Sequence, residues 1–89
     1  LYYAQGRYGE AEPLFRRSLQ IQEQQLGADH PDTAISLLNL AALYFKLNQL
    51  AEAKPLIDRA VAIFEHRLGA DHPHTISARQ WWQDIHQNR

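Results

Sequence analysis

The sequence predicts an all-α protein built from helix–turn–helix hairpins stacked side by side. The chain of 89 residues repeats itself with an offset of 42 positions, and so contains about two similar units. Within each unit, apolar residues recur with the three-and-four spacing of amphipathic helices. No stretch alternates apolar and polar residues, as a half-buried strand would. The length allows one small domain.

The repeat is clearest between residues 26–33, which read LGADHPDT, and residues 68–75, which read LGADHPHT. Roughly half of the first 33 residues are identical to the residue 42 positions later. Such self-similarity indicates a repeat architecture. We divide the chain into a partial first repeat at 1–30, a complete repeat at 31–72 and a C-terminal helix at 73–89.

The first unit opens on the end of a helix. Leu1 and Tyr2 align with Leu43 and Tyr44, and Gly6-Arg7 then interrupts the apolar pattern. A helix is expected over residues 8–26, because its apolar residues keep helical spacing. Gly27 follows it, in the place that glycine often takes after a helix. The apolar positions of this helix are Tyr8, Ala11, Phe15, Leu19 and Leu26.

The next helix is expected to begin near Pro31, because proline fits the first helical turn, where its missing N–H costs nothing. Asp29 and His30 are candidate N-caps. The helix should end near residue 47, since Asn48-Gln49 breaks the pattern. Its packing stripe comprises Ala34, Leu37, Leu40, Ala41, Tyr44 and Leu47.

The partner helix should run from residue 50 to 68 and end before Gly69. Pro55, like Pro13 one unit earlier, lies inside its helix, and we interpret both as a tolerated bend near the helix start. Asp71 and His72 are candidate caps of a last helix that starts near Pro73. Small residues should meet large ones where helices pack, and neighbouring hairpins must cover the remaining apolar faces. The small set is Ala41, Ala53 and Ala60; the large set is Tyr44, Leu50 and Ile57.

These residues resemble the tetratricopeptide repeat. Its signature spacing is matched by Leu40-Ala41, Tyr44, Asn48, Leu50, Ala53, Ile57 and Ala60, and again by Tyr2, Gly6, Tyr8, Ala11, Phe15 and Ser18. The usual unit of that family has 34 residues. The longer unit here, with Leu-Gly-Ala-Asp-His-Pro between hairpins, is similar to the kinesin-light-chain subtype. The resemblance implies a right-handed α–α superhelix that acts as a protein-interaction scaffold.

In this family the first helix of each hairpin lines a concave groove for extended or helical peptides. The resemblance implies that the Phe45 side chain anchors a bound peptide. It also implies that the Asn39 amide hydrogen-bonds to the backbone or to a carboxylate of that peptide. The alternative is that ordinary packing or the next superhelical turn buries the residues of this face. For Trp81, we prefer a role in the core or in the cap of the array. The stripe comprises Ile35, Leu38, Asn39, Ala42, Phe45 and Lys46, followed in the last helix by Ser77, Gln80, Trp81, Asp84, Gln87 and Asn88.

The two ends of the array are expected to differ. Where Leu37, Ala41 and Tyr44 would recur, the last helix has Arg79, Gln83 and His86. Terminal repeats with a polar outer face act as caps, so we expect this end to lie at or near the C-terminus of the array. The helix over 8–26 lacks its hairpin partner. Its apolar face should be covered in a longer protein or by self-association with a second copy.

Composition narrows the function classes. The net charge of −1 gives no basic excess for phosphates, so nucleic acid is not an expected partner. Cysteine is absent, which rules out disulfides and fits a reducing, cytoplasmic setting. No apolar run is long enough for a membrane span, so no membrane partner is expected.

Chemistry of an enzyme or a cofactor is not expected. No catalytic triad order or glycine-rich phosphate loop is recognisable. His66, Asp71, His72 and His74 are suitable zinc ligands, but the repeated cap motif explains His72 without a metal. Other charged residues are expected to be solvated; they are Glu10, Glu12, Arg16, Arg17, Glu52, Asp58 and Arg59. The leading hypothesis is a scaffold that binds a peptide or partner domain, and the alternative is a structural spacer or self-association segment.

Overall fold

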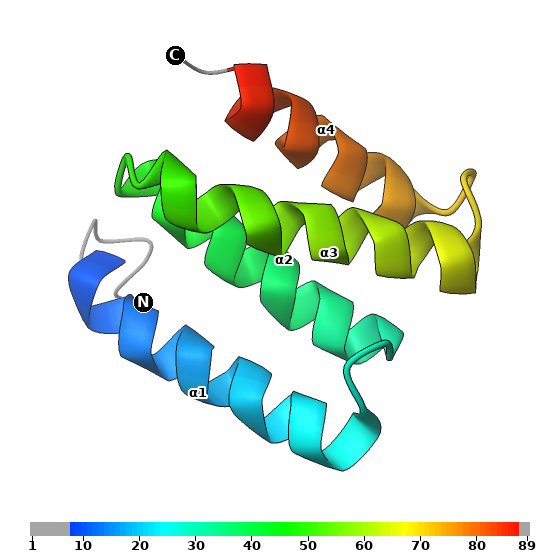
Figure 1. Cartoon of the computed structure of the whole chain (residues 1–89), viewed down its shortest axis with the longest axis horizontal. Coiled ribbons are helices and arrows are strands. Elements are labelled where there is room, and N and C mark those ends of the chain that lie inside the picture. Colours follow the sequence, from blue (N-terminus) through cyan, green and yellow to red (C-terminus); the bar gives the residue numbers. More distant parts are fainter. Residues whose placement is uncertain (1–7, 88–89) are drawn as a thin grey trace.

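A computed structural model describes residues 8–87, and every regular element within them is a helix. The order is α1 (Tyr8–Leu26), α2 (Pro31–Lys46), α3 (Leu50–Leu68) and α4 (Pro73–Gln87). Since the described part of the chain contains no strand, the all-α prediction is confirmed. The helix end expected over residues 1–5 lies outside the described residues. The four helices lie side by side in chain order (Figure 1).

Histidines cap the starts of α2 and α4. The Asp32 N–H donates to Nδ1 of His30 over 3.0 Å, and the His74 N–H donates to Nδ1 of His72 over the same distance. An N-cap side chain satisfies one of the N–H groups that a helix start leaves without a carbonyl. Of the two candidate caps in each unit, the histidine therefore fills the role. Proline follows at the first helical position, as the sequence predicts.

Left-handed residues end the helices. Gly27 has φ 97° and Gly69 has φ 88°, directly after α1 and α3. Glycine adopts this conformation without the steric penalty of a Cβ. In the turn between α2 and α3, Asn48 has φ 60°; asparagine tolerates this region better than most residues. These three positions explain why the chain can reverse within short loops.

Pro13 and Pro55 are accommodated inside α1 and α3, and both helices continue through the proline. Both residues are exposed and lie in the second turn of their helix. There the ring meets solvent, and only one backbone hydrogen bond near the helix start is lost.

The core lies along α2, which α1 and α3 flank on two sides. The small and large residues expected to pack together share the core, since Ala41, Ala53, Ala60 and Ile57 are fully buried and Tyr44 is nearly so. Leu50 is half-buried at the edge. Close-packed interiors need this fit of shapes, because voids forfeit dispersion contacts. The fully buried apolar residues of α2 are Ala34, Leu37, Leu40, Ala41 and Leu43, with Tyr44 nearly so.

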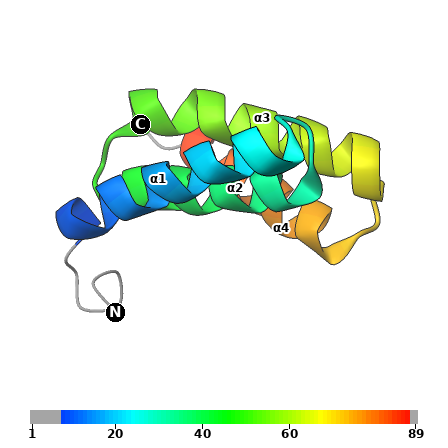
Figure 2. The same cartoon turned by 90° about the horizontal axis from the view of Figure 1, so that it is seen from below.

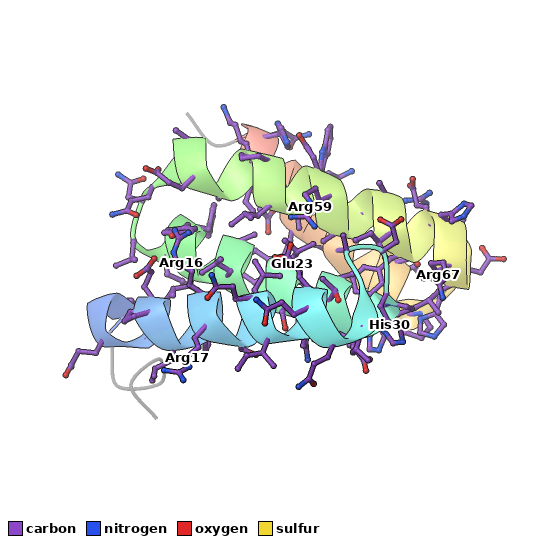
Figure 3. The ribbon with its side chains drawn as sticks, turned by 60° about the horizontal axis from the view of Figure 1, so that its bottom comes forward. Arg16, Arg17, Glu23, His30, Arg59 and Arg67 are labelled. Atoms are coloured by element: carbon purple, nitrogen blue, oxygen red, sulfur yellow. The ribbon has the colours of Figure 1, made fainter. Side chains whose placement is uncertain are left out.

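Each helix packs chiefly on its chain neighbours. α1 contacts α2, α2 contacts α3, α3 contacts α4, and α2 also touches α4. In Figure 2, α3 lies on one side of the stack and α4 on the other. Polar bonds at the surface connect helices that are further apart in the chain: Arg59 pairs with Glu23 at 3.1 Å and Arg67 donates to the Asp29 carbonyl at 3.0 Å (Figure 3). The arrangement is a stack of helical hairpins.

Within residues 8–87, none of the helices combines the length and the apolar character that crossing a bilayer requires.

Candidate functional site

A pocket opens where α1, α2 and α4 meet, on the face that the sequence predicts as a groove. Its volume is about 410 Å³, within the range of small-ligand and side-chain pockets. Three helices contribute to it because α2 lies between the other two and is in contact with both. The lining residues are Phe15 from α1, Leu38, Asn39 and Ala42 from α2, and Ser77 and Trp81 from α4.

Trp81 forms one wall of this pocket. Its indole meets the ring of Phe45 edge-on, with ring centroids 5.7 Å apart and an angle of 80° between the planes. Edge-to-face contact is a favoured geometry for aromatic pairs. Trp81 is half-buried against the core, and it also faces the pocket. Trp81 therefore packs against the core and also lines the pocket, and its role as a binding anchor stays a prediction.

The predicted stripe residues within 8–87 fall into three groups. The pocket lining includes five of them: Leu38, Asn39, Ala42, Ser77 and Trp81. Phe45 lies against Trp81 and supports the wall. The others lie outside the lining: Ile35 is half-buried against the core, and the exposed residues are Lys46, Gln80, Asp84 and Gln87. Asn88 lies outside the described residues.

Phe15 is the lining residue that the groove prediction missed. In the repeat it aligns with Ile57, a fully buried core position of α3. That alignment indicates packing, and Phe15 is indeed half-buried against α2. Its second role depends on α4 and α1 lying on opposite flanks of α2, which only the tertiary arrangement shows.

The polar groups of the pocket are uncharged. Asn39 is exposed and contributes an amide, and Ser77 is exposed and contributes a hydroxyl. Neither side chain forms a hydrogen bond to another residue in the described range 8–87, so both are available to a ligand. Among the described residues, the lining holds no ionisable side chain.

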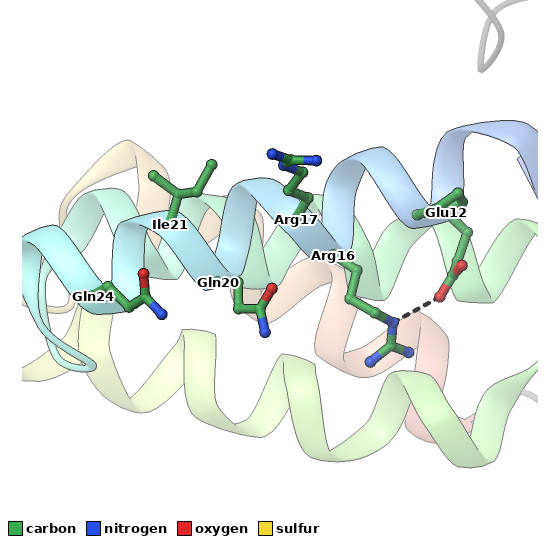
Figure 4. A pocket seen from close by; sticks show the side chains of 7 residues that line it. Glu12, Arg16, Arg17, Gln20, Ile21 and Gln24 are labelled. Carbon is green, nitrogen blue, oxygen red and sulfur yellow. Dashed lines mark hydrogen bonds and ion pairs between the residues drawn. The ribbon is translucent and has the colours of Figure 1, made fainter.

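A second depression, of about 430 Å³, runs along α1 alone (Figure 4). It carries both carboxylate and guanidinium groups, from Glu12, Arg16 and Arg17. Beside them α1 exposes Leu14 at 56%, Ile21 at 43% and Leu26 at 43%. We call these three residues the α1 outer face. α1 therefore has an exposed apolar face, but it is not the one expected, since Phe15 and Leu19 pack into the core.

Glu12, Arg16 and Tyr44 form a hydrogen-bonded cluster between α1 and α2. Arg16 Nε and the Tyr44 hydroxyl donate to the same oxygen of Glu12, over 2.8 Å and 2.7 Å, and the Arg16 guanidinium also donates to the Tyr44 hydroxyl. The bond from Arg16, and then that from Tyr44, lowers the pKa of Glu12. Burial, with the neighbouring Glu12, raises the pKa of Tyr44. The expectation that Glu12 is solvated is wrong, since this carboxylate is half-buried and bonded. Arg16 is exposed, as expected, and Arg17 points away from the helices (Figure 3).

Polar bonds also hold α4 on α3. Oδ1 of Asp58 accepts from Trp82 Nε1 over 2.8 Å and lies 2.9 Å from His86 Nε2. The rings of Trp82 and His86 lie 4.4 Å apart. One turn or more away, Arg79 pairs with Glu65. Asp58, expected to be solvated, is thus a bonding partner, as is Arg59 through Glu23.

The model of the family described as Tetratricopeptide repeat matches residues 1–66. The chain belongs to the tetratricopeptide repeat family. No curated protein matches it. The family resemblance read from the sequence is thereby confirmed. Repeats of this family generally mediate protein–protein interactions.

The tetratricopeptide match ends before α4, which begins at Pro73. That helix is also where the sequence departs from the repeat pattern. Trp81 and Trp82, one facing the pocket and the other facing α3, therefore lie outside the matched region.

In this tetratricopeptide array, the histidines of the repeated motif act as N-caps of the helices that follow them. The rings of His72 and His74 lie 4.9 Å apart, but Nδ1 of His72 accepts the cap bond. Across residues 8–87, no three histidine, cysteine or acidic side chains come together in a way that could hold a metal ion.

Proposed function

We propose that this array binds a peptide or a partner domain on the face formed by α2 and α4. The observation that carries the proposal is the pocket between Phe15, Ala42 and Trp81, with unbonded polar groups at its rim. Apolar pockets with a few oriented polar groups are the usual form of binding sites. The predicted groove residues outside the pocket lining would extend the contact along both helices; they are Ile35, Phe45, Lys46, Gln80 and Asp84.

The neighbouring tryptophans supply a matched test. Peptides selected from a random displayed library against the purified chain should lose affinity about tenfold or more on Trp81→Ala, because tryptophans in binding pockets are often energetic hot spots. Asn39→Ala should weaken the same peptides. Trp82→Ala should leave binding unchanged, since Trp82 faces Asp58 of α3. Circular dichroism checks that each variant folds. Peptides that bind all three variants equally would contradict the proposal.

A second candidate function is self-association through the α1 outer face, which would make the chain a structural spacer or assembly segment. Its support is the row of exposed apolar residues Leu14, Ile21 and Leu26. Exposed apolar patches commonly mark contact surfaces. Light scattering at several concentrations tests this: a mass that rises with concentration, and falls back on Ile21→Glu, favours it. A constant monomer mass contradicts it.

The finer assignments belong to the proposal as well. The 42-residue unit and the Leu-Gly-Ala-Asp-His-Pro connection support the kinesin-light-chain-like subtype. The absence of cysteine supports a cytoplasmic location. We also propose residues 1–30 as a partial repeat, 31–72 as a complete one and 73–89 as a cap. The polar bonds of Arg79 and His86 to α3 support the cap.

A further inference from the structure

A depression of about 430 Å³ lies open between α3 and α4, away from the groove. Its lining residues are Val61, Glu65, Arg79, Trp82 and Gln83. The residues 42 positions earlier are Leu19 and Glu23 of α1 and Leu37, Leu40 and Ala41 of α2. The same surface therefore occurs twice in the chain, once between α1 and α2 and once between α3 and α4.

The earlier copy of this surface is covered by α3. Its four apolar residues are at most 8% exposed, α3 packs on α2, and Glu23 of α1 pairs with Arg59 of α3 at 3.1 Å. Among residues 8–87, no helix takes the corresponding place beside α4. Trp82 is consequently 39% exposed, whereas its equivalent Leu40 is buried. The depression therefore has the position of a surface on which an α3-like helix packs.

The helix of this chain that matches α3 is α1. Leu14 and Ile21 of the α1 outer face are the equivalents of Leu56 and Ile63, and both are exposed. α1 and α4 lie at opposite ends of the stack (Figure 1), so one copy cannot bring the two surfaces together. We propose that the α1 outer face of a second copy docks in the depression between α3 and α4, joining copies head to tail. This inference rests on the second candidate function, self-association, and names the surface that α1 meets.

Charges on the two surfaces are complementary. Within the chain, Arg59 pairs with Glu23; across the proposed contact, the equivalent pair is Arg17 of the second copy with Glu65. Arg17 is exposed and points away from the helices (Figure 3). Arg79 bonds to Oε2 of Glu65, and a carboxylate can accept at both oxygens. Glu65 can therefore accept from a second guanidinium.

A second polar contact has an equivalent across the copies. Arg67 of α3 donates to the carbonyl of Asp29, in the loop after α1. The matching groups are the side chain of Gln25 in the second copy and the carbonyl of Asp71, in the loop after α3. Gln25 is exposed, and its amide can donate. The proposed contact thus repeats the polar bonds of the internal one with compatible groups.

Pairing of two α1 outer faces with each other is less favourable. In an antiparallel pair that sets Leu14 against Ile21 of the other copy, the two Arg17 side chains lie near each other at the centre. Like charges across an interface are unfavourable. The head-to-tail contact is heterologous, so it leaves one free end on each side and allows growth beyond two copies. Polar Arg79 and Gln83 in the depression should keep the association weak.

Sedimentation of the purified chain at concentrations up to the millimolar range tests the proposal. The mass should rise beyond that of a dimer. Ile21→Glu blocks the α1 end. Ile76→Glu should block the α4 end, since Ile76 is 54% exposed one turn before Arg79, and its equivalent Ala34 is buried. Each variant alone should stay monomeric, and an equal mixture should form a one-to-one complex through the two intact ends.

A charge exchange tests the register. Arg17→Glu should raise the dissociation constant about fivefold or more, because two carboxylates would then face each other. Adding Glu65→Arg to the same chain should recover part of the loss. Lys46→Glu makes the same change in net charge on the groove face and should leave association unchanged. A double variant no better than Arg17→Glu would contradict the Arg17–Glu65 contact. Circular dichroism checks that each variant folds.

The outcomes separate this inference from self-association in general. A closed dimer that is lost on Ile21→Glu but kept on Ile76→Glu would leave self-association through α1 in place and overturn the head-to-tail contact. A mixture of the two variants that forms no complex would also overturn it. A monomer mass at every concentration would overturn both. Growth beyond a dimer, lost in each variant and replaced by a one-to-one complex in their mixture, supports both.

Discussion

Thr33 and Thr75 stand at the same position of the two units and are both fully buried, yet their hydroxyls have different surroundings. Thr33 Oγ1 donates to the Gly27 carbonyl over 2.8 Å. Thr75 Oγ1 has no hydrogen-bond partner within the described residues. The loops differ because the Gly27 N–H bonds to the Glu23 carbonyl, whereas the Gly69 N–H reaches one residue further back, to Phe64.

This difference predicts unequal effects of one substitution. Thr33→Val should lower the free energy of unfolding by about 1–3 kcal/mol, because it removes a bond and leaves a carbonyl without its partner. Thr75→Val should change it by less than about 0.5 kcal/mol or stabilise the chain, since it removes a hydroxyl that is buried without a bond. Chemical denaturation measures both. Equal losses would mean that the two loops are closed alike.

Glu12 predicts an acid-sensitive contribution to stability. Because its pKa is lowered in the folded chain, the folded state binds the proton less readily than the unfolded state does. The contribution is therefore complete above the ordinary pKa of a glutamate, from about pH 5 upward, and is lost as the pH falls through the lowered pKa of the folded state. Arg16 is largely exposed, so the size should be below about 1 kcal/mol.

Denaturation at several pH values checks this prediction. Glu12→Gln should be less stable than the unchanged chain at pH 7, and the difference should disappear as the pH falls through the lowered pKa of Glu12. Glu52→Gln, an exposed residue of α3, is the control. A difference for Glu12→Gln that persists at low pH would show that the carboxylate charge is not its source.

At the scale of the helix, α1 and α3 are equivalent elements with different surroundings. α3 packs against both α2 and α4, whereas α1, among the helices of residues 8–87, packs chiefly against α2. Ile63 of α3 is 7% exposed, and its equivalent in α1, Ile21, is 43% exposed. The same residue type thus lies once in the core and once on the α1 outer face.

Substitutions at these two isoleucines measure how much packing against a second helix contributes to the free energy of unfolding. Ile63→Ala should lower the free energy of unfolding by about 2–4 kcal/mol, through lost burial and the cavity that remains. Ile21→Ala should lower it by less than about 1 kcal/mol. Thermal or chemical denaturation at low protein concentration gives both values. A large loss for Ile21→Ala would indicate that the α1 outer face is covered in solution, in favour of self-association.

The helices could be predicted from the sequence because their boundaries depend on local chemistry. His30 with Pro31 starts α2, Gly27 ends α1 and Asn48 turns the chain, each through bonds or dihedrals within a few residues. The 42-residue offset then transfers each boundary from one unit to the other.

The candidate site was less predictable because it combines three helices. Helical spacing placed Leu38, Asn39, Ala42 and Trp81 on one face. It could not show that Phe15 reaches the same pocket, or that Trp82 reaches Asp58, since both depend on how α1 and α4 pack on their neighbours. For the same reason, the sequence does not show which charged residues on helix surfaces bond to a neighbouring helix. A solvated and a bonded carboxylate, such as those of Glu52 and Glu12, look alike in sequence.

At the scale of the whole molecule, α4 has polar residues at positions where α2 has residues of its packing stripe. We call these positions of α2 the hairpin seam. Leu37, Ala41 and Tyr44 of that seam are buried, whereas Arg79 and Gln83 are exposed and His86 is half-buried. Arg79 and His86 bond to α3, so these positions carry polar groups in place of the seam residues, while Ile76 and Trp82 leave some apolar surface of α4 exposed.

Restoring the seam residues should make the chain associate. The triple change Arg79→Leu, Gln83→Ala and His86→Tyr gives α4 an apolar stripe with nothing to cover it, and such stripes drive association. Sedimentation should show oligomers at a concentration at least about tenfold lower than for the unchanged chain. The control Lys54→Leu with Glu52→Ala adds apolar groups to exposed positions of α3. Unchanged mass for the triple variant would contradict a capping role for α4.

The order of contacts along the stack has a mechanical consequence. Each helix touches mainly the one before and the one after it, and the connecting loops have three or four residues. A pull applied to the two ends should therefore separate one helix–helix boundary at a time. Each separated helix stays tethered beside its former neighbour, so recoil after release should be rapid. We therefore expect the array to extend and recover elastically under a pulling force.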